Sequence, residues 1–505
     1  MHAKLRTRAL LAALLGASLA GCVLPPHPAQ APQATVIRNT TIVDTRDGAL
    51  RRGVSVLIEQ GRIARITPGA MAPAPASAQV VDGTGKYLVP SYLDMHAHML
   101  DDAHQQPQVW PLLVANGVTG VQEMSGSAAT VRRARQVNAE SRAGRLLAPE
   151  ILRVPGVTIV SARTAEQGRQ QVRDNQALGG DFVKLLNASP EATRAALDEA
   201  RQRHLPVVGH LPLGITGREA ARLGWRSFEH LGAGLGLLLE CSTDEDAIRR
   251  QALQNAPPPF VPEFIANPIA YAAADLPLYR RLVDSYSEER CRALVQALAR
   301  SGSWQAPTLV RLRTMLLSND PRYASDPRLI YMPGRTRALW ARANQRYVAT
   351  HAPEAVRTLA QVYARQQHLV GLMQAHGVPL MTGSDLGGIW VLPGYGLHDE
   401  FAELAAAGLT PLQVLQAATL NGARYLGREA SMGTVDEGKN ADLVLLDANP
   451  LESVAHLARI SAVVLQGRYL PRRTLDALLQ AAAQGEAGPP VAEAGPLPGR
   501  GGHRH

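Results

Sequence analysis

Short runs in which apolar and polar positions alternate fill residues 35–88 of the chain. Turn signals such as Asp47-Gly48 separate these runs, and the combination predicts half-buried strands joined as hairpins. The same texture returns at 432–472. The two β-rich segments lie far apart in the sequence, so they predict one small composite β-sandwich domain built from both ends of the chain.

The middle of the chain, residues 89–431, alternates apolar β-like runs with helix-patterned stretches. The expected strands are 88–95, 118–124, 151–154, 181–186, 205–209, 226–229, 304–309 and 378–383. Eight strands alternating with helices favour an α/β fold, a parallel (β/α)8 TIM barrel inserted into the β-sandwich domain. The interval 231–303 is much longer than the other connections and is predicted to be an insertion that covers the substrate.

Both ends of the chain have the features of segments outside the folded domains. Residues 1–21 combine a short basic stretch with an apolar run too short to span a bilayer, which predicts a signal peptide. Small residues lead directly into Cys22 and resemble the lipobox of bacterial lipoproteins, in which this cysteine is lipidated. An ordinary secretory signal, with Cys22 incidental, is the alternative. Residues 22–34 are rich in Pro and Ala and predict an extended tether, and 473–505 a helix followed by a disordered tail.

Either interpretation of the leader predicts an exported protein, and the lipoprotein one predicts a membrane anchor in the periplasm or on the outer membrane of a bacterium. The formal net charge of +9 does not indicate a nucleic-acid partner, because no basic run reaches five residues. Three cysteines are too few for a disulfide framework in 505 residues. Whether Cys241 and Cys291 pair is left open.

Residues able to bind metal or move protons stand at the ends of the expected barrel strands. Two histidines two positions apart on one strand point to the same side of it, which suits a divalent metal. A single pair of histidines at this spacing is nevertheless a weak signal. Barrel enzymes place catalytic groups at the carboxyl ends of their strands. Five strands here supply such residues together, namely His96, His98, Lys184, His210, His230 and Asp385. Packing alone does not account for this coincidence.

Several of these segments resemble landmarks of the amidohydrolase superfamily, in its imidazolonepropionase-like and Xaa-Pro dipeptidase-like branch. LVPSYLDMHAH is similar to the first-strand motif of that branch, DFVKLL to the fourth and TGSDLGG to the eighth. MGTVDEGKNADLVLLD resembles its C-terminal run. The resemblance covers about residues 35–470, and Ser91 departs from it where the branch usually has glycine.

The resemblance implies a centre with two divalent metal ions. His96, His98 and Asp385 would hold one ion, and His210 and His230 the other. Lys184 would bridge both as a carbamate formed with carbon dioxide. An anionic carbamate suits that place, whereas a plain ammonium would be repelled by two cations. The alternative is a neutral or ion-paired Lys184 beside a single metal. Zinc is the default metal for imidazole and carboxylate ligands, and manganese or cobalt would also fit.

The implied activity is hydrolysis of a carbon–nitrogen bond, in an amide or a peptide. A hydroxide bridging the metals would attack the carbonyl carbon, and Asp385 would act as general acid and base. His230 would also contact the oxyanion. Dipeptides or N-acyl amino acids with a free carboxylate are the expected small-molecule substrates, with His398 and Tyr271 as candidate substrate-binding residues.

Other functions remain open from the sequence. The same centre could serve an esterase, a lactonase or a cyclic-amide hydrolase, because the chemistry at the metals hardly changes. A catalytically silent exported binding lipoprotein is the alternative outside enzymes, although the complete ligand set argues against a decayed site. Assembly into a homo-oligomer is a further expectation that the sequence leaves open.

Overall fold

The computed structural model describes residues 34–69, 74–100, 108–255 and 261–485. The expected signal peptide, lipidation at Cys22 and nearly all of the tether therefore lie outside the described residues, as does the expected tail from residue 486. Within the described ranges, none of the helices combines the length and the apolar character needed to cross a membrane.

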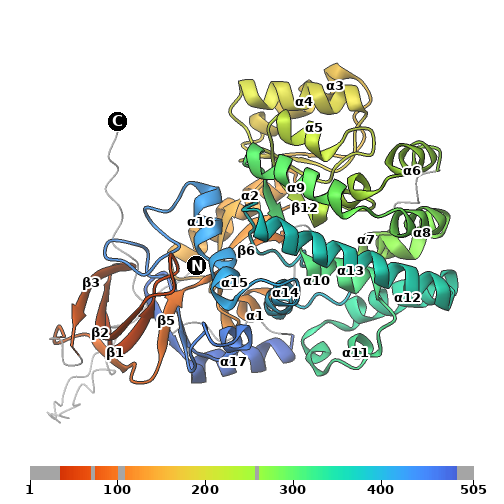
Figure 1. The fold of residues 1–505 in the computed structure, drawn as a ribbon. Coiled ribbons are helices and arrows are strands. Elements are labelled where there is room, and N and C mark those ends of the chain that lie inside the picture. Colours follow the sequence, from red (N-terminus) through yellow and green to blue (C-terminus); the bar gives the residue numbers. More distant parts are fainter. Residues whose placement is uncertain (1–33, 70–73, 101–107, 256–260, 486–505) are drawn as a thin grey trace, which may run out of the picture.

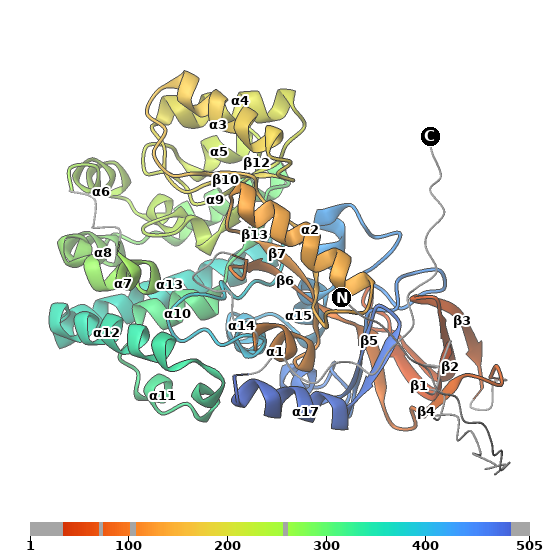
Figure 2. The same cartoon turned by 180° about the vertical axis from the view of Figure 1, so that it is seen from behind.

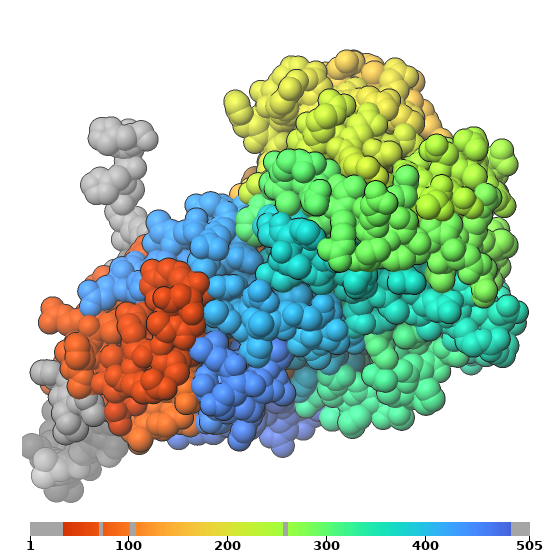
Figure 3. Space-filling model, in the orientation of Figure 1, coloured from red at the N-terminus to blue at the C-terminus, as the bar shows by residue number. Residues whose placement is uncertain are grey.

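Strands from the two ends of the described chain form one eight-stranded sheet, at the end of the molecule drawn in red, orange and blue in Figures 1 and 3. Its order is β16-β15-β14-β5-β1-β2-β3, with β4 paired to β1. The strands are β1 Ala34–Val43, β2 Leu50–Glu59, β3 Arg62–Pro68, β4 Gln79–Asp82, β5 Tyr87–Pro90, β14 Leu443–Leu446, β15 Ile460–Leu465 and β16 Arg468–Pro471. The sandwich arrangement expected for these segments stays a prediction.

The join between the two ends is the antiparallel pair of β5 and β14, in which Val89 lies opposite Val444. The apolar residues of the alternating pattern bury one face of this sheet, with Ile37, Leu88 and Leu445 in a shared core. Alternation with period two thus places hydrophobic side chains from residues more than 350 positions apart on one surface.

Two parallel sheets form the middle of the molecule. One has the order β6-β7-β8 and the other β13-β12-β11-β10-β9, and every pairing within them is parallel. The strands are β6 Tyr92–Ala97, β7 Val118–Glu123, β8 Glu150–Arg153, β9 Thr158–Ile159, β10 Val183–Leu185, β11 Val207–Gly209, β12 Trp225–Glu229 and β13 Trp304–Ala306. The α/β class with parallel strands, part of the sequence prediction, is therefore confirmed.

Two of the expected strands differ in the structure. The run 88–95 is divided at Ser91, whose amide bonds to the carbonyl of Asp442, so its halves belong to different sheets. The run 378–383 forms no regular strand and makes an isolated parallel bridge at Leu380, followed by another at Leu386. Between these bridges the backbone of Asp385 turns into the left-handed region, which interrupts a continuous ladder.

Helices connect and cover the parallel strands (Figures 1 and 2). Those up to β12 are α1 Val109–Ala115, α2 Ala128–Arg142, α3 Ala165–Ala177, α4 Pro190–Gln202 and α5 Gly217–Arg222. Side chains cap several of them; Thr164 and Gln167, for example, form a reciprocal capping box at the start of α3. The C-terminal helices are α13 Pro353–Ala375, α14 Tyr395–Ala406, α15 Pro411–Ala418, α16 Leu420–Leu426 and α17 Arg472–Ala483.

The long connection after β12 is helical. It contains η2 Leu237–Cys241, α6 Glu245–Ala252, α7 Pro262–Ala266, η3 Pro268–Tyr271, α8 Leu276–Asp284 and α9 Glu288–Ser301. A disulfide joins Cys241 of η2 to Cys291 of α9, so these two cysteines do pair. A second helical stretch follows β13, with α10 Leu309–Leu316, α11 Pro321–Ala324 and α12 Gly334–Thr350. Because α12 packs against α7, the two stretches together form one side of the molecule (Figure 1).

Candidate metal centre

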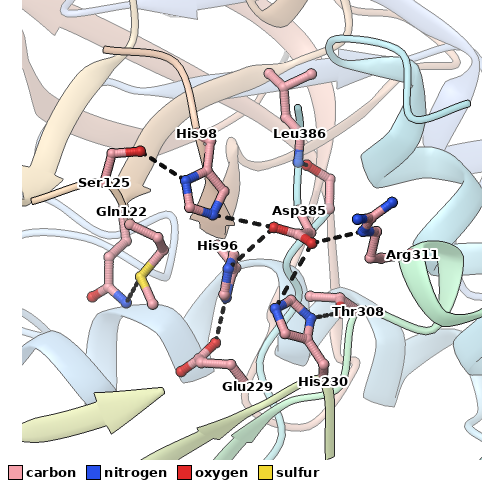
Figure 4. Close-up of polar contacts among 12 residues, drawn as sticks. His96, His98, Gln122, Ser125, Glu229, His230, Thr308, Arg311, Asp385 and Leu386 are labelled. Atoms are coloured by element: carbon pink, nitrogen blue, oxygen red, sulfur yellow. Dashed lines mark hydrogen bonds and ion pairs between the residues drawn. The ribbon is translucent and has the colours of Figure 1, made fainter. Parts of the chain in front are cut away.

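The carboxylate of Asp385 lies among three imidazoles from two separate strand ends (Figure 4). Its Oδ1 atom is 3.2 Å from Nε2 of His96 and 3.3 Å from Nε2 of His98. Its Oδ2 atom is 3.7 Å from Nε2 of His230. His96 and His98 come from β6 and its end, and His230 directly follows β12. The expectation that these strand ends converge therefore holds in the structure.

The other ring nitrogen of each imidazole has a hydrogen-bonding partner. The partners of Nδ1 are Glu229 for His96 at 2.6 Å, Ser125 for His98 at 2.8 Å and Thr308 for His230 at 2.5 Å. A partner on one nitrogen fixes the orientation of the ring and directs the other nitrogen. All three Nε2 atoms are consequently aimed at one small volume around Asp385.

Burial keeps most of these imidazoles neutral. Burial, followed by the charge of Lys184, lowers the pKa of His98 to about 4 and that of His210 to about 3. Burial also takes the pKa of His230 well below its usual value. The neutral imidazole is the form that binds metal, because one of its nitrogens carries a lone pair. His96 differs: burial lowers its pKa, but contacts with Asp385 and Glu229 raise it above the usual value.

Burial on its own would raise the pKa of Asp385, yet the result is a pKa well below the ordinary aspartate value. The imidazoles of His230, His96 and His98, whose Nε2 atoms lie 3.2 to 3.7 Å from the carboxylate oxygens, outweigh the burial. Asp385 is therefore an anion at neutral pH, able to bind a cation or to accept a proton.

Lys184 and His210 lie next to the same cluster. Lys184 is buried on β10, with Nζ 3.3 Å from Nε2 of His98. The ring of His210, the residue after β11, is centred 5.2 Å from the ring of His230. All six residues expected at strand ends are thus brought into one region, whereas their individual roles remain predictions.

Three residues at this centre have a left-handed backbone: His230 with φ 53°, Thr308 with φ 44° and Asp385 with φ 55°. Such a conformation costs a residue other than glycine about 1–3 kcal/mol and persists only where the surroundings enforce it. Strain of this kind gathers at functional sites. The hydroxyl of Thr308 is also hydrogen-bonded to Nδ1 of His230, so two of the three strained residues are in direct contact.

Arg311 makes a contact with Asp385 that the sequence did not suggest. Its Nε donates to Oδ2 of Asp385 at 3.0 Å (Figure 4). Its two terminal nitrogens donate to the carbonyls of Ala266 at 2.7 Å and Ile265 at 3.1 Å. The guanidinium is buried and lies on α10. It therefore ties the central carboxylate to the end of α7.

The donor set fits a divalent metal. Ligand atoms of His96, His230 and Asp385 all lie within 4.8 Å of one another. The Nε2 atom of His96 is buried and lies 3.2 Å from Oδ1 of Asp385, in a geometry that does not qualify as a hydrogen bond. A metal ion bound by the imidazole nitrogen and the carboxylate would satisfy both atoms.

The two candidate substrate-binding residues lie elsewhere. His398, on α14, has Nε2 2.9 Å from the carbonyl of Asn116, and its ring packs edge-on against Tyr92 and Phe401. Tyr271, at the end of η3, has the guanidinium of Arg346 4.0 Å above its ring. Neither is among the residues that line the cavity beside His98. Their assignment to substrate binding stays a prediction without support from these contacts.

Comparison with known proteins relates part of the chain to a known family. The sequence profile of the amidohydrolase family matches residues 334–470. The chain contains an amidohydrolase family domain. An imidazolonepropionase from Rhizorhabdus wittichii is 26% identical, over 81% of this chain and 92% of that protein. A dihydroorotase from Pelobacter propionicus is 28% identical, but the match spans only 38% of this chain and 46% of that protein.

Solved amidohydrolase structures have the same fold. Bottromycin amidohydrolase is similar with a TM-score of 0.65 and 22% identity, over 91% of this chain and 94% of its own. A Xaa-Pro dipeptidase with bound methionine has a TM-score of 0.61 and 16% identity, over 87% of this chain and all of its own. The family resemblance predicted from the strand-end motifs is confirmed.

Proposed function

We propose that this protein is a metal-dependent hydrolase of carbon–nitrogen bonds. The observation that carries the proposal is the convergence of three oriented imidazoles on the anionic Asp385. Relatives and structural neighbours named imidazolonepropionase, Xaa-Pro dipeptidase and bottromycin amidohydrolase support the same reaction class. We further propose that the two parallel sheets are the wall of one (β/α)8 barrel, with the site at the carboxyl ends of its strands.

The residues proposed to hold metal are those expected from the sequence. His96, His98 and Asp385 would bind one ion, and His210 and His230 a second. The low pKa values of His98 and His210 support this assignment, because the neutral imidazole is the form that binds a metal ion. When bound, the metals would polarise the substrate carbonyl and lower the pKa of a water molecule. Zinc is the proposed metal, with manganese or cobalt as alternatives.

The proposal for Lys184 rests on electrostatics. Its side chain is buried next to His98 and 2% exposed, where an unmodified ammonium would sit beside two cations. Reaction with carbon dioxide would replace that positive charge with an anionic carbamate. The modified side chain would then be a ligand shared by both metals.

Asp385 is the proposed proton carrier. Its low pKa keeps it ionised, so it can accept a proton from a water molecule at the centre and pass that proton to the leaving nitrogen. Arg311 holds Oδ2 in place, and the side of the carboxylate with Oδ1 faces His96 and His98. His230 would contact the oxygen on which negative charge develops.

The proposed substrates are dipeptides or N-acyl amino acids with a free carboxylate. We also propose that the protein is an exported lipoprotein anchored through Cys22. The buried disulfide between Cys241 and Cys291 supports export, since such bonds persist in oxidising compartments.

The experiment is an assay of Asp385→Asn at matched metal content, on dipeptides and N-acyl amino acids with added zinc or manganese. We expect the loss of turnover with much of the metal retained, because the amide cannot carry the proton. Asp447→Asn is the matched control, since Asp447 is a surface carboxylate paired with Lys86. Full activity of the Asp385 variant would contradict the proposed role. Wild-type protein that binds no metal would favour the silent binding lipoprotein, and turnover of esters alone would favour an esterase.

A further inference from the structure

A cavity of about 240 Å³ opens beside the candidate metal centre. His98 and Leu386 line its inner side, and Leu386 directly follows Asp385. Its walls include Ile265 of α7, Met332 just before α12, and Leu339 and Trp340 of α12. The cavity is therefore formed between the metal centre and the two helical stretches that follow β12 and β13.

The lining is almost entirely apolar. Among the described lining residues, only His98, Thr336 and the indole N–H of Trp340 offer polar side-chain atoms, and none is acidic, lysine or arginine. A charged group placed there without a partner would lose its hydration at a cost of several kcal/mol. An apolar group would instead gain roughly 25 cal/mol for each Å² removed from water. The lining thus favours an uncharged apolar occupant.

The volume limits the size of that occupant. A protein cavity of about 150 Å³ holds benzene, so about 240 Å³ accommodates a somewhat larger group, such as an aromatic or branched aliphatic side chain. A whole dipeptide does not fit in addition. The cavity therefore takes one side of the substrate.

Side-chain contacts fix the position of the cavity walls relative to the candidate metal centre. Arg311 bonds to Asp385 and to the carbonyls of Ile265 and Ala266 in α7. The ring of Trp340 packs edge-on against Trp390, with centroids 5.5 Å apart. A group seated in the cavity is consequently positioned relative to the carboxylate that we assign as proton carrier.

We propose that this cavity binds one bulky, uncharged apolar group of the substrate, next to the bond that is cleaved. The inference rests on the proposed amide hydrolase function of the adjoining centre. It restricts the dipeptides or N-acyl amino acids to those with an aromatic or branched aliphatic group on one side of the scissile bond.

The test compares pairs of dipeptides in which one position is Phe or Leu in one member and Asp or Lys in the other, at each side of the bond. At one of the two positions we expect a kcat/KM at least tenfold higher for the apolar member. Ile265→Asp should reduce that ratio at least tenfold by placing a carboxylate in the cavity. Ile265 is 46% exposed, so folding should tolerate the change. Val348→Asp is the matched control, because Val348 is 56% exposed on α12 and does not line the cavity.

Indole binding, measured by calorimetry, provides a readout that does not need turnover. Indole is neutral, apolar and close to a tryptophan side chain in size, and we expect Ile265→Asp to weaken its binding at least tenfold while Val348→Asp leaves it unchanged. Equal kcat/KM for both members of every pair, or equal selectivity in the two variants, overturns the inference. If no amide is cleaved, the proposed function fails, and indole binding alone decides the inference: binding sensitive to Ile265→Asp supports an apolar site, and undetectable or insensitive binding overturns it.

Discussion

The disulfide between Cys241 and Cys291 offers a perturbation whose size follows from the structure. It joins the short helix η2 to α9 across a sequence separation of 50 residues, and both side chains are fully buried. Replacing both cysteines by alanine opens this loop. The unfolded chain then gains conformational freedom, and the folded state loses the corresponding stabilisation.

The magnitude comes from the entropy of closing a loop of that length. For 50 residues the chain-entropy relation corresponds to about 4 kcal/mol at 25 °C. Unfolding entropy is about 2.1 cal/mol/K per residue, or roughly 1 kcal/mol/K for a chain of 505 residues that unfolds cooperatively. The expected decrease in Tm is therefore about 4 °C.

The assay is calorimetric unfolding of the native protein, oxidised and reduced, and of the Cys241→Ala/Cys291→Ala variant. Reduced native protein keeps both sulfur atoms, so its decrease in Tm isolates the covalent link from the packing of the side chains. The variant should show no further change with reductant. Thiol labelling of the denatured samples verifies each redox state. An unchanged Tm in fully reduced native protein would refute the loop-closure reasoning, and free thiols in protein taken from an oxidising compartment would refute the pairing itself.

Three further changes test the centre and the sheet. Arg311→Lys keeps a positive charge but loses the branched guanidinium that contacts Asp385 and α7 together. We therefore expect kcat/KM to fall about tenfold or more at unchanged metal content. Unchanged kinetics would exclude the positioning role. Glu229→Gln removes the anion on Nδ1 of His96 and should weaken metal binding by about 10–100-fold in a chelator competition, with the circular dichroism spectrum as a control for folding. Burial raises the pKa of Asp442 from 3.8 to about 6, so its contribution to stability is complete below pH 4 and is lost as the pH rises through 6. Asp442→Asn should therefore be more stable than the native protein at pH 8, by up to about 3 kcal/mol, and should lose this advantage at pH 4. An equal difference in Tm between the two proteins at pH 8 and at pH 4 would contradict the raised pKa of Asp442.

Much of the architecture follows from periodicity in the sequence. Alternation in 35–88 and 441–470 identified segments that pair in one sheet, because burial of one face selects for a period of two. The eighth expected strand shows where that reasoning fails. Apolar residues near Leu380 predict extended structure, but the left-handed turn at Asp385 depends on contacts with residues distant in sequence. No local pattern encodes such a constraint.

The candidate metal centre was predictable because the residues proposed as ligands stand at strand ends, where the fold brings together side chains that are up to about 290 residues apart. The residues that orient those ligands were missed. Glu229 ends the expected strand 226–229, and Thr308 falls within the expected strand 304–309, so neither position stood out in the sequence. Glu229 next to His230 was the one available signal, since an acidic residue inside an apolar strand needs a partner. The partner, His96, comes from another strand and could be found only from the fold.

Arg311 connects the proposed chemistry with the proposed selectivity. The residues proposed as metal ligands come from strand ends, whereas the cavity walls include residues of the helices α7 and α12. A bond from the guanidinium to Asp385 and two more to the carbonyls of α7 connect these two parts of the structure. The bonds to Asp385 and Ala266 are buried, so breaking either leaves an unpaired polar atom away from water. If the cavity binds a substrate group as proposed, a group that packs poorly against Ile265 is therefore expected to be misplaced relative to Asp385. Selectivity should therefore appear in kcat/KM and not in binding alone.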